Sequence, residues 1–83
     1  MQYRTEIIPN GALIERTRIL AGLNKQEVAT KAGIPHSSII RAERSQGVSA
    51  KTAAGICAVL GVAFDDLFQI VRPGGAADKT REG

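Results

Sequence analysis

The chain has 83 residues, of which 43% are hydrophobic, which is enough for one small domain with its own core and too much for a chain that is disordered throughout. Its single cysteine, Cys57, excludes an internal disulfide, and the longest uncharged apolar stretch, residues 53–64, is shorter than the roughly 20 residues that a membrane span requires. No secretory signal is recognised at the N-terminus, so we expect a soluble domain in the cytoplasm.

The net charge of +3 is unevenly distributed along the chain. Residues 13–51 carry seven basic and three acidic side chains, a net +4, whereas residues 52–71 carry only Asp65 and Asp66. A basic part beside an acidic part is typical of a domain that binds a polyanion with one face. A randomly solvated surface explains this distribution nearly as well, so charge alone does not decide between the two.

The N-terminal third predicts a short strand and then a helix. Residues 3–8 alternate in polarity and are rich in strand formers, and residues 9–11 end that strand. Asn10 then caps a helix that Gly22 terminates. The apolar positions that follow its helical period are Leu13, Ile14, Leu20 and Leu23.

Two helices separated by a glycine are predicted next. Asn24 caps the helix of residues 25–32, with Glu27 at the spacing of a capping box, and Gly33 stops it. After Pro35 a third helix covers residues 36–44 and ends in a polar loop.

The last part of the chain predicts two more helices and a second strand. Ser49 caps a helix over residues 50–60, and a short helix follows at residues 64–68. The inner stripe of the longer helix comprises Ala53, Ile56, Cys57 and Leu60. Residues 68–72 are again β-prone, and Pro73 opens a polar tail that we expect to be disordered. We therefore divide the chain into an arm with a strand (1–9), a helical domain (10–68) and a strand with a tail (69–83).

Seven positions between Lys25 and Ala42 fit the requirements of a helix-turn-helix. The motif needs apolar and small residues where its two helices cross, and a glycine where the backbone turns with a positive φ. An ordinary pair of short helices needs neither the small residue nor the glycine at these places. The matching residues are Val28, Ala29, Ala32, Gly33, Ile34, Ile39 and Ala42.

From about residue 13 to residue 68 the chain resembles the Cro/C1-type (XRE) helix-turn-helix family of phage repressors and bacterial regulators. The resemblance rests on Arg18, Gly22-Leu23-Asn24, Glu27, Ala29, Gly33, Ile39, Arg41, Glu43-Arg44, Ser49, Leu60-Gly61-Val62 and Leu67-Phe68. It implies an all-α fold, a five-helix lambda-repressor-like bundle, here with a short β-strand expected at each terminus. It also implies double-stranded DNA as the partner, bound by a homodimer.

The resemblance assigns the reading of bases to the exposed face of the third helix. The implied base-contacting residues are His36, Ser37, Ile40 and Arg41. Arg41 suits a bidentate contact with a guanine edge, and Ile40 suits a thymine methyl. Core packing is the alternative for Ile40, although Ile39 and Ile40 cannot both face inward on one turn.

Contacts with the DNA backbone are implied for four further residues, Asn24, Lys25, Arg44 and Gln46. The N-terminus of the second helix offers free amides to a phosphate, so Asn24 is expected to act both as cap and as contact. Arg18 and Glu43 match a family pair that joins the first helix to the recognition helix, with a phosphate contact by Arg18 left open.

The sequence departs from the family at three places. Lys25 stands where many relatives have glutamine, and Pro35 stands where most cap the recognition helix with serine or threonine. Pro35 has no side-chain acceptor for a hydrogen bond, so a start of the recognition helix one residue away from His36 is the alternative. The loop of residues 45–48 is about one residue shorter than usual and lacks the usual basic residue, which weakens the assignment of Gln46.

Chemistry other than DNA binding finds little support in the sequence. Cys57 lies on an inner helical stripe, and His36 has no cysteine or second histidine near it for a zinc site. There is no serine-histidine-acid set, so we expect no enzyme, no cofactor and no small-molecule substrate. Asp65 and Asp66 fit stabilisation of a helix dipole better than a paired carboxylate.

The sequence therefore favours a repressor-like transcriptional regulator that binds a palindromic operator as a homodimer. An antitoxin or a phage directionality factor of the same fold is the alternative, and a protein-interaction module without DNA affinity is a third hypothesis. The two terminal strands are expected to pair with each other, within one chain or between two.

Overall fold

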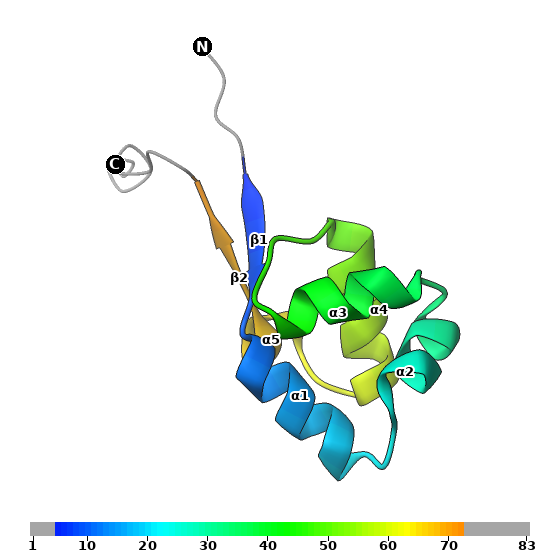
Figure 1. The fold of residues 1–83 in the computed structure, drawn as a ribbon. Helices are drawn as coiled ribbons and strands as arrows, with labels where there is room; N and C mark the ends of the chain where they lie inside the picture. Colours follow the sequence, from blue (N-terminus) through cyan, green and yellow to red (C-terminus); the bar gives the residue numbers. More distant parts are fainter. Residues whose placement is uncertain (1–4, 73–83) are drawn as a thin grey trace.

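The computed structural model describes residues 5–72, which form five helices and a two-stranded sheet (Figure 1). In chain order the elements are β1 (Glu6–Pro9), α1 (Gly11–Leu20), α2 (Lys25–Ala32), α3 (His36–Glu43), α4 (Ala50–Leu60), α5 (Phe64–Leu67) and β2 (Phe68–Val71). The five-helix bundle with terminal strands is confirmed. The expected disorder of residues 73–83 and the first two residues of the expected N-terminal strand lie outside the described residues.

Side-chain caps begin three of the helices, as the sequence predicts. The side chains of Asn10 and Ser49 accept hydrogen bonds from backbone N–H groups three residues ahead, at the starts of α1 and α4. At α2 the capping box is complete, because Asn24 Oδ1 accepts from the N–H of Glu27 at 2.8 Å and Glu27 Oε1 accepts from the N–H of Asn24 at 2.8 Å. These bonds satisfy amide groups that a helix start otherwise leaves without an acceptor.

The start of α3 has no side-chain cap. Pro35 occupies the N-cap position with extended backbone angles, and its carbonyl accepts from the N–H of Ser38 at 2.9 Å. The helix nevertheless begins at His36, so the proline does not shift it. It ends at Glu43, one residue earlier than predicted, and Arg44 is its C-cap.

The two terminal strands pair with each other antiparallel within one chain. Ile7 lies opposite Ile70, and Pro9 lies opposite Phe68, so the strand continues through the proline that was expected to end it. The carbonyl of Ile7 also accepts from the N–H of Val48 at 3.2 Å, which ties the strand to the loop after α3. The sheet projects from the helices, at the end of the molecule away from the C-terminal end of α1 (Figure 1).

The core is a single cluster to which all five helices and β2 contribute. Its buried members are Ile14, Val28, Ala29, Ile39, Ala42, Ala53, Ile56, Cys57, Leu67 and Phe68. The expected inner stripe of α4 is confirmed for three of its members, and Leu60 is half-buried at the edge of the cluster.

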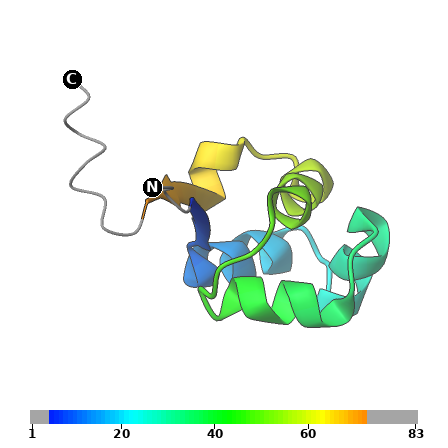
Figure 2. The ribbon, with the colours of Figure 1, turned by 90° about the horizontal axis from the view of Figure 1, so that it is seen from above.

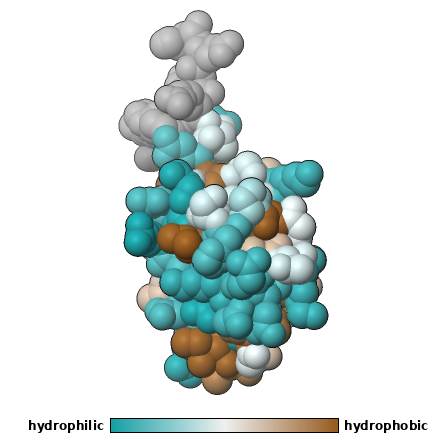
Figure 3. All heavy atoms as spheres, turned by 45° about the vertical axis from the view of Figure 1, so that its right-hand side comes forward, coloured by the Kyte–Doolittle hydropathy of each residue, from teal (hydrophilic) through white to brown (hydrophobic). Residues whose placement is uncertain are grey.

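The apolar stripe predicted for α1 is wrong for two of its members. Ile14 is buried, but Leu13 is 36% exposed and Leu20 is 72% exposed. Arg18, one turn beyond Ile14, takes the inward position because α1 packs against α3 and α5 on that face alone. Figure 3 shows an apolar patch at the lower end of the molecule, where Figure 1 places the end of α1.

Candidate nucleic-acid interface

Helices α2 and α3 form the helix-turn-helix predicted from the sequence. Val28 and Ala29 on α2 and Ile39 and Ala42 on α3 are almost completely buried against one another and the core. Gly33 turns the chain between them with φ +71°, a backbone conformation that residues with a Cβ atom adopt only at a cost in free energy. Figure 2 shows α3 along one outer side of the bundle, where its free face is open to a partner.

The four residues expected to read bases differ in exposure. His36 and Ser37 are exposed in the first turn of α3, and Arg41 is exposed in its last turn. Ile40 is half-buried, whereas its neighbour Ile39 is completely buried. The structure thus brings three polar side chains to the surface of one helix, with Ile40 partly available beside them.

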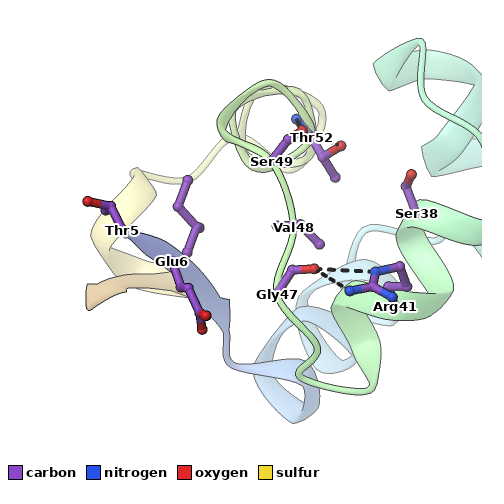
Figure 4. A pocket seen from close by; sticks show the side chains of 9 residues that line it. Thr5, Glu6, Ser38, Arg41, Gly47, Val48, Ser49 and Thr52 are labelled. Atoms are coloured by element: carbon purple, nitrogen blue, oxygen red, sulfur yellow. Dashed lines mark hydrogen bonds between the residues drawn. The ribbon is translucent and has the colours of Figure 1, made fainter. Parts of the chain in front are cut away.

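Arg41 makes a contact that the sequence did not predict. Its Nη2 and Nε donate to the carbonyl oxygen of Gly47 at 2.8 and 3.3 Å, which holds the guanidinium against the loop between α3 and α4 (Figure 4). Ser38, one turn earlier on α3, lines the same open hollow of about 430 Å³. Ser38 is not among the residues that the sequence analysis selected, although its spacing of three from Arg41 puts the two on the same face of the helix.

The four residues expected to contact the DNA backbone lie at the ends of α2 and α3. Asn24 is exposed and occupied as the cap of α2, and Lys25 is half-buried in its first turn. Arg44 and Gln46 are exposed just beyond α3. The capping box already satisfies the amides of Asn24 and Glu27, so the amides that a phosphate could bind at the start of α2 are those of Lys25 and Gln26.

The expected pair between α1 and α3 is present with bidentate geometry. Arg18 Nε donates to Glu43 Oε2 at 2.6 Å and Arg18 Nη2 donates to Oε1 at 3.2 Å, while Nη1 donates to the carbonyl of Leu23 at 3.0 Å. The hydrogen bond to Glu43 raises the pKa of Arg18, outweighing the opposite effect of burial. All three nitrogens of the guanidinium donate within the protein, so the pair joins α1 to α3 and to the turn before α2.

A second joint between α1 and the end of α3 was not foreseen. The N–H of Gly11 donates to Ser45 Oγ at 2.9 Å, and Ser45 adopts a positive φ of 59°. A Cβ atom on Gly11 would lie 2.3 Å from the carbonyl oxygen of Glu43, so only glycine fits where α1 starts. Proximity of this kind between residues 34 positions apart leaves no mark in local sequence.

Within residues 5–72, no helix is both long enough and apolar enough to cross a membrane. The same part of the chain contains no group of three or more histidine, cysteine or acidic side chains that could hold a metal ion.

Comparison with known proteins identifies the motif. The family model HTH_3, described as helix-turn-helix, matches residues 14–67. No curated protein sequence matches significantly.

Solved structures give the same fold. SinR, solved as the "master regulator for biofilm formation SinR in complex with DNA", is 30% identical with a TM-score of 0.61, over 66% of this chain and 90% of that one. SinR in its complex with SinI is also 30% identical with a TM-score of 0.61, and this chain spans about half of it, 54%. The transcriptional regulator VanUg is 19% identical with a TM-score of 0.59, over 87% of this chain and 92% of that one, and supports the fold alone.

The family model covers the recognition motif, the buried pair between α1 and α3 and the helices that support them. The match agrees with the expectation that the chain is not an enzyme. The chain belongs to the Cro/C1-type helix-turn-helix family of DNA-binding transcriptional regulators.

Proposed function

We propose that this protein is a repressor-like regulator that binds a specific sequence of double-stranded DNA with α3 in the major groove. The observation that carries the proposal is the exposed face of α3, where His36, Ser37 and Arg41 lie on a helix whose opposite face is fixed in the core. A rigid helix with free polar donors is what the major groove accommodates. SinR, which shares the fold at 30% identity, was solved with DNA, and this supports the same partner here.

Arg41 is the residue that we assign to the most specific contact. In the free protein two of its nitrogens donate to the Gly47 carbonyl. A bidentate contact with guanine O6 and N7 would replace that bond in the complex and would favour guanine over other bases by about 1–3 kcal/mol. His36 and Ser37 would read the neighbouring base edges, and Ile40 would contact a thymine methyl with its exposed part.

The backbone contacts are assigned to the ends of the two helices. The first turn of α2, with Asn24 and Lys25, offers amides and one positive charge to a phosphate, and Arg44 and Gln46 offer donors beyond α3. These contacts set the register of α3 and carry no sequence information themselves. Two copies on a palindromic operator would place their recognition helices about 34 Å apart, one helical turn of DNA.

Selection of bound sequences from random DNA at near-physiological salt tests the proposal directly. We expect a palindromic consensus, and an affinity whose logarithm falls with the logarithm of salt concentration by about 0.9 per phosphate contacted. Recovery of no consensus, with no DNA affinity even at low salt, would overturn the proposal.

Two variants then separate the recognition of a base from the general attraction of a positive charge to DNA. Arg41→Ala should lose the preference for one base pair at each half-site while keeping weak non-specific binding. Lys31→Ala is the matched control, because Lys31 is also an exposed cation, on α2, and is assigned no contact. If Arg41→Ala binds the selected site as tightly as the parent, the assignment of the reading face is wrong.

A further inference from the structure

One peptide group, between Gly47 and Val48, connects Arg41 to the N-terminal strand. Its carbonyl accepts from Arg41 Nη2 and Nε at 2.8 and 3.3 Å, and its N–H donates to the carbonyl of Ile7 on β1 at 3.2 Å. The C=O and N–H of a trans peptide point in opposite directions, so the group lies between its two partners. Figure 4 shows the loop in this place, with β1 on one side and α3 on the other.

Both sides of this connection are fixed to the domain. Ile7 and Val48 are half-buried and pack against the core, which holds β1 and the loop against one another. On the other side Arg41 holds the loop twice, because its own carbonyl also accepts from the N–H of Gln46 at 3.0 Å. The guanidinium of Arg41 therefore rests on a carbonyl whose position depends on strand β1.

The charge of Arg41 strengthens the connection. A guanidinium that donates to a carbonyl polarises the whole peptide group, so the N–H on the other side becomes a better donor. The bond from Arg41 to Gly47 and the bond from Val48 to Ile7 therefore support each other. Strand β1 lies outside residues 14–67, which the family model matches, so this support comes from outside the matched motif.

We propose that Ile7 is a positioning residue for Arg41: through the Gly47–Val48 peptide, strand β1 holds the guanidinium against the loop until a guanine replaces the carbonyl. The proposal rests on the proposed function for the contact between Arg41 and a base. On DNA without the correct base Arg41 keeps its internal acceptor, whereas at the correct base that bond is given up. Strand β1 therefore lowers the affinity for the correct sequence and leaves non-specific affinity unchanged. By linkage, a strand that holds the loop less firmly gives a tighter specific complex.

Amide hydrogen exchange in the whole chain without DNA, followed by NMR, tests the connection itself. Arg41→Met keeps a long side chain but removes its donors, and the Val48 N–H should then exchange about two- to tenfold faster, the factor that one hydrogen bond contributes. Arg44→Met is the matched control, since Arg44 is an exposed cation at the C-cap of α3, and should leave that rate unchanged. The N–H of Ile34, which donates to the Ala29 carbonyl in the turn after α2, is the reference for a general loss of stability.

Affinity measurements then test the effect on recognition. Ile7→Ala loosens the strand on the loop, so we expect about two- to tenfold tighter binding to the sequence selected from random DNA and unchanged binding to a scrambled duplex. Damage to the fold would instead weaken both complexes. Ile70→Ala is the matched control, because Ile70 lies opposite Ile7 in the sheet but is 60% exposed and belongs to β2, not to the strand that accepts from Val48. It should leave both affinities unchanged.

Each measurement has a result that overturns the proposal. For the connection, that result is a Val48 exchange rate in Arg41→Met that rises no more than the rate of Ile34. For the positioning role of Ile7, it is unchanged or weaker binding of Ile7→Ala to the selected sequence, or an equal gain in Ile70→Ala. If circular dichroism shows that Ile7→Ala does not fold, Ile7→Val carries the same test with a smaller gain. Failure to select any DNA sequence overturns the proposed function, whereas the exchange rates, measured without DNA, test the connection by themselves.

Discussion

The guanidinium of Arg18 on α1 binds both carboxylate oxygens of Glu43 in the last turn of α3, with Nε to Oε2 at 2.6 Å and Nη2 to Oε1 at 3.2 Å. The side chains are only 10% and 6% exposed, so very little water reaches the ion pair. Together with the contact between Gly11 and Ser45, it fixes the end of the recognition helix to the helix that starts the bundle.

Breaking this pair should destabilise the fold strongly. Glu43→Ala leaves the charge of Arg18 buried without its partner, which costs about 3–5 kcal/mol of the free energy of unfolding. Urea unfolding measures the loss, and Glu15→Ala, which removes an exposed acid from α1, the helix of Arg18, is the control that should change little. The double variant Arg18→Met/Glu43→Leu should recover much of the stability, because neither charge remains buried. A loss below about 1 kcal/mol in Glu43→Ala would contradict this account.

Gly11 should resist replacement although it stands at the first position of a helix. In Gly11→Ala the new Cβ would lie 2.3 Å from the Glu43 carbonyl oxygen, so α1 has to move away from α3, at a cost of about 1–3 kcal/mol. Gly47→Ala is the matched control, since its Cβ would lie 3.7 Å from the nearest atom, the Ile7 carbonyl oxygen. Thermal unfolding of both variants checks the difference, and equal melting temperatures would refute the steric argument.

The helices and the reading motif were predictable because their determinants are local. Asn24, Glu27 and Gly33 define α2 by capping and turning the chain within a few residues, and the spacing from Val28 to Ala42 then defines the pair. α3 began at His36 despite Pro35, because a helix start needs acceptable backbone angles more than it needs a side-chain cap.

The features that escaped prediction depend on tertiary contacts. Leu13 and Leu20 follow a helical period as well as Ile14 does, but only the face of α1 that α3 and α5 cover is buried. Besides Ile14, that face carries Arg18, whose charge Glu43 neutralises. The bond from Arg41 to the Gly47 carbonyl depends on the path of a loop. Neither follows from periodicity, since periodicity does not say what covers a face.

Arg41→Lys should separate charge from geometry at the reading face. Lysine keeps the positive charge but lacks the planar fork that binds two guanine acceptors, so we expect specificity at that base pair to fall by about 1–3 kcal/mol while non-specific affinity stays nearly unchanged. Fluorescence anisotropy with the selected operator and with a scrambled duplex, at one salt concentration, measures both terms. Equal losses on the two duplexes would mean that Arg41 contacts phosphate and reads no base.

Stability should fall at alkaline pH because of Cys57. Burial raises the pKa of its thiol, and the carboxylate of Asp66 adds to the effect. A raised pKa means that the folded state binds the proton more tightly than the unfolded state. The contribution of the protonated Cys57 thiol to the free energy of unfolding is therefore fully present below the unfolded pKa of about 8.5. It is lost as the pH rises through the folded pKa.

Urea unfolding between pH 7 and pH 10, on the parent protein and on Cys57→Ala, measures this effect. The alanine variant loses packing at every pH, so its free energy of unfolding starts lower, but it should decline less steeply above about pH 8.5 than that of the parent, because no thiol remains to ionise. All other groups are identical in the two proteins, so the difference between the two profiles isolates the thiol. If the two profiles stay parallel up to pH 10, the thiol of Cys57 does not contribute to the pH dependence of stability.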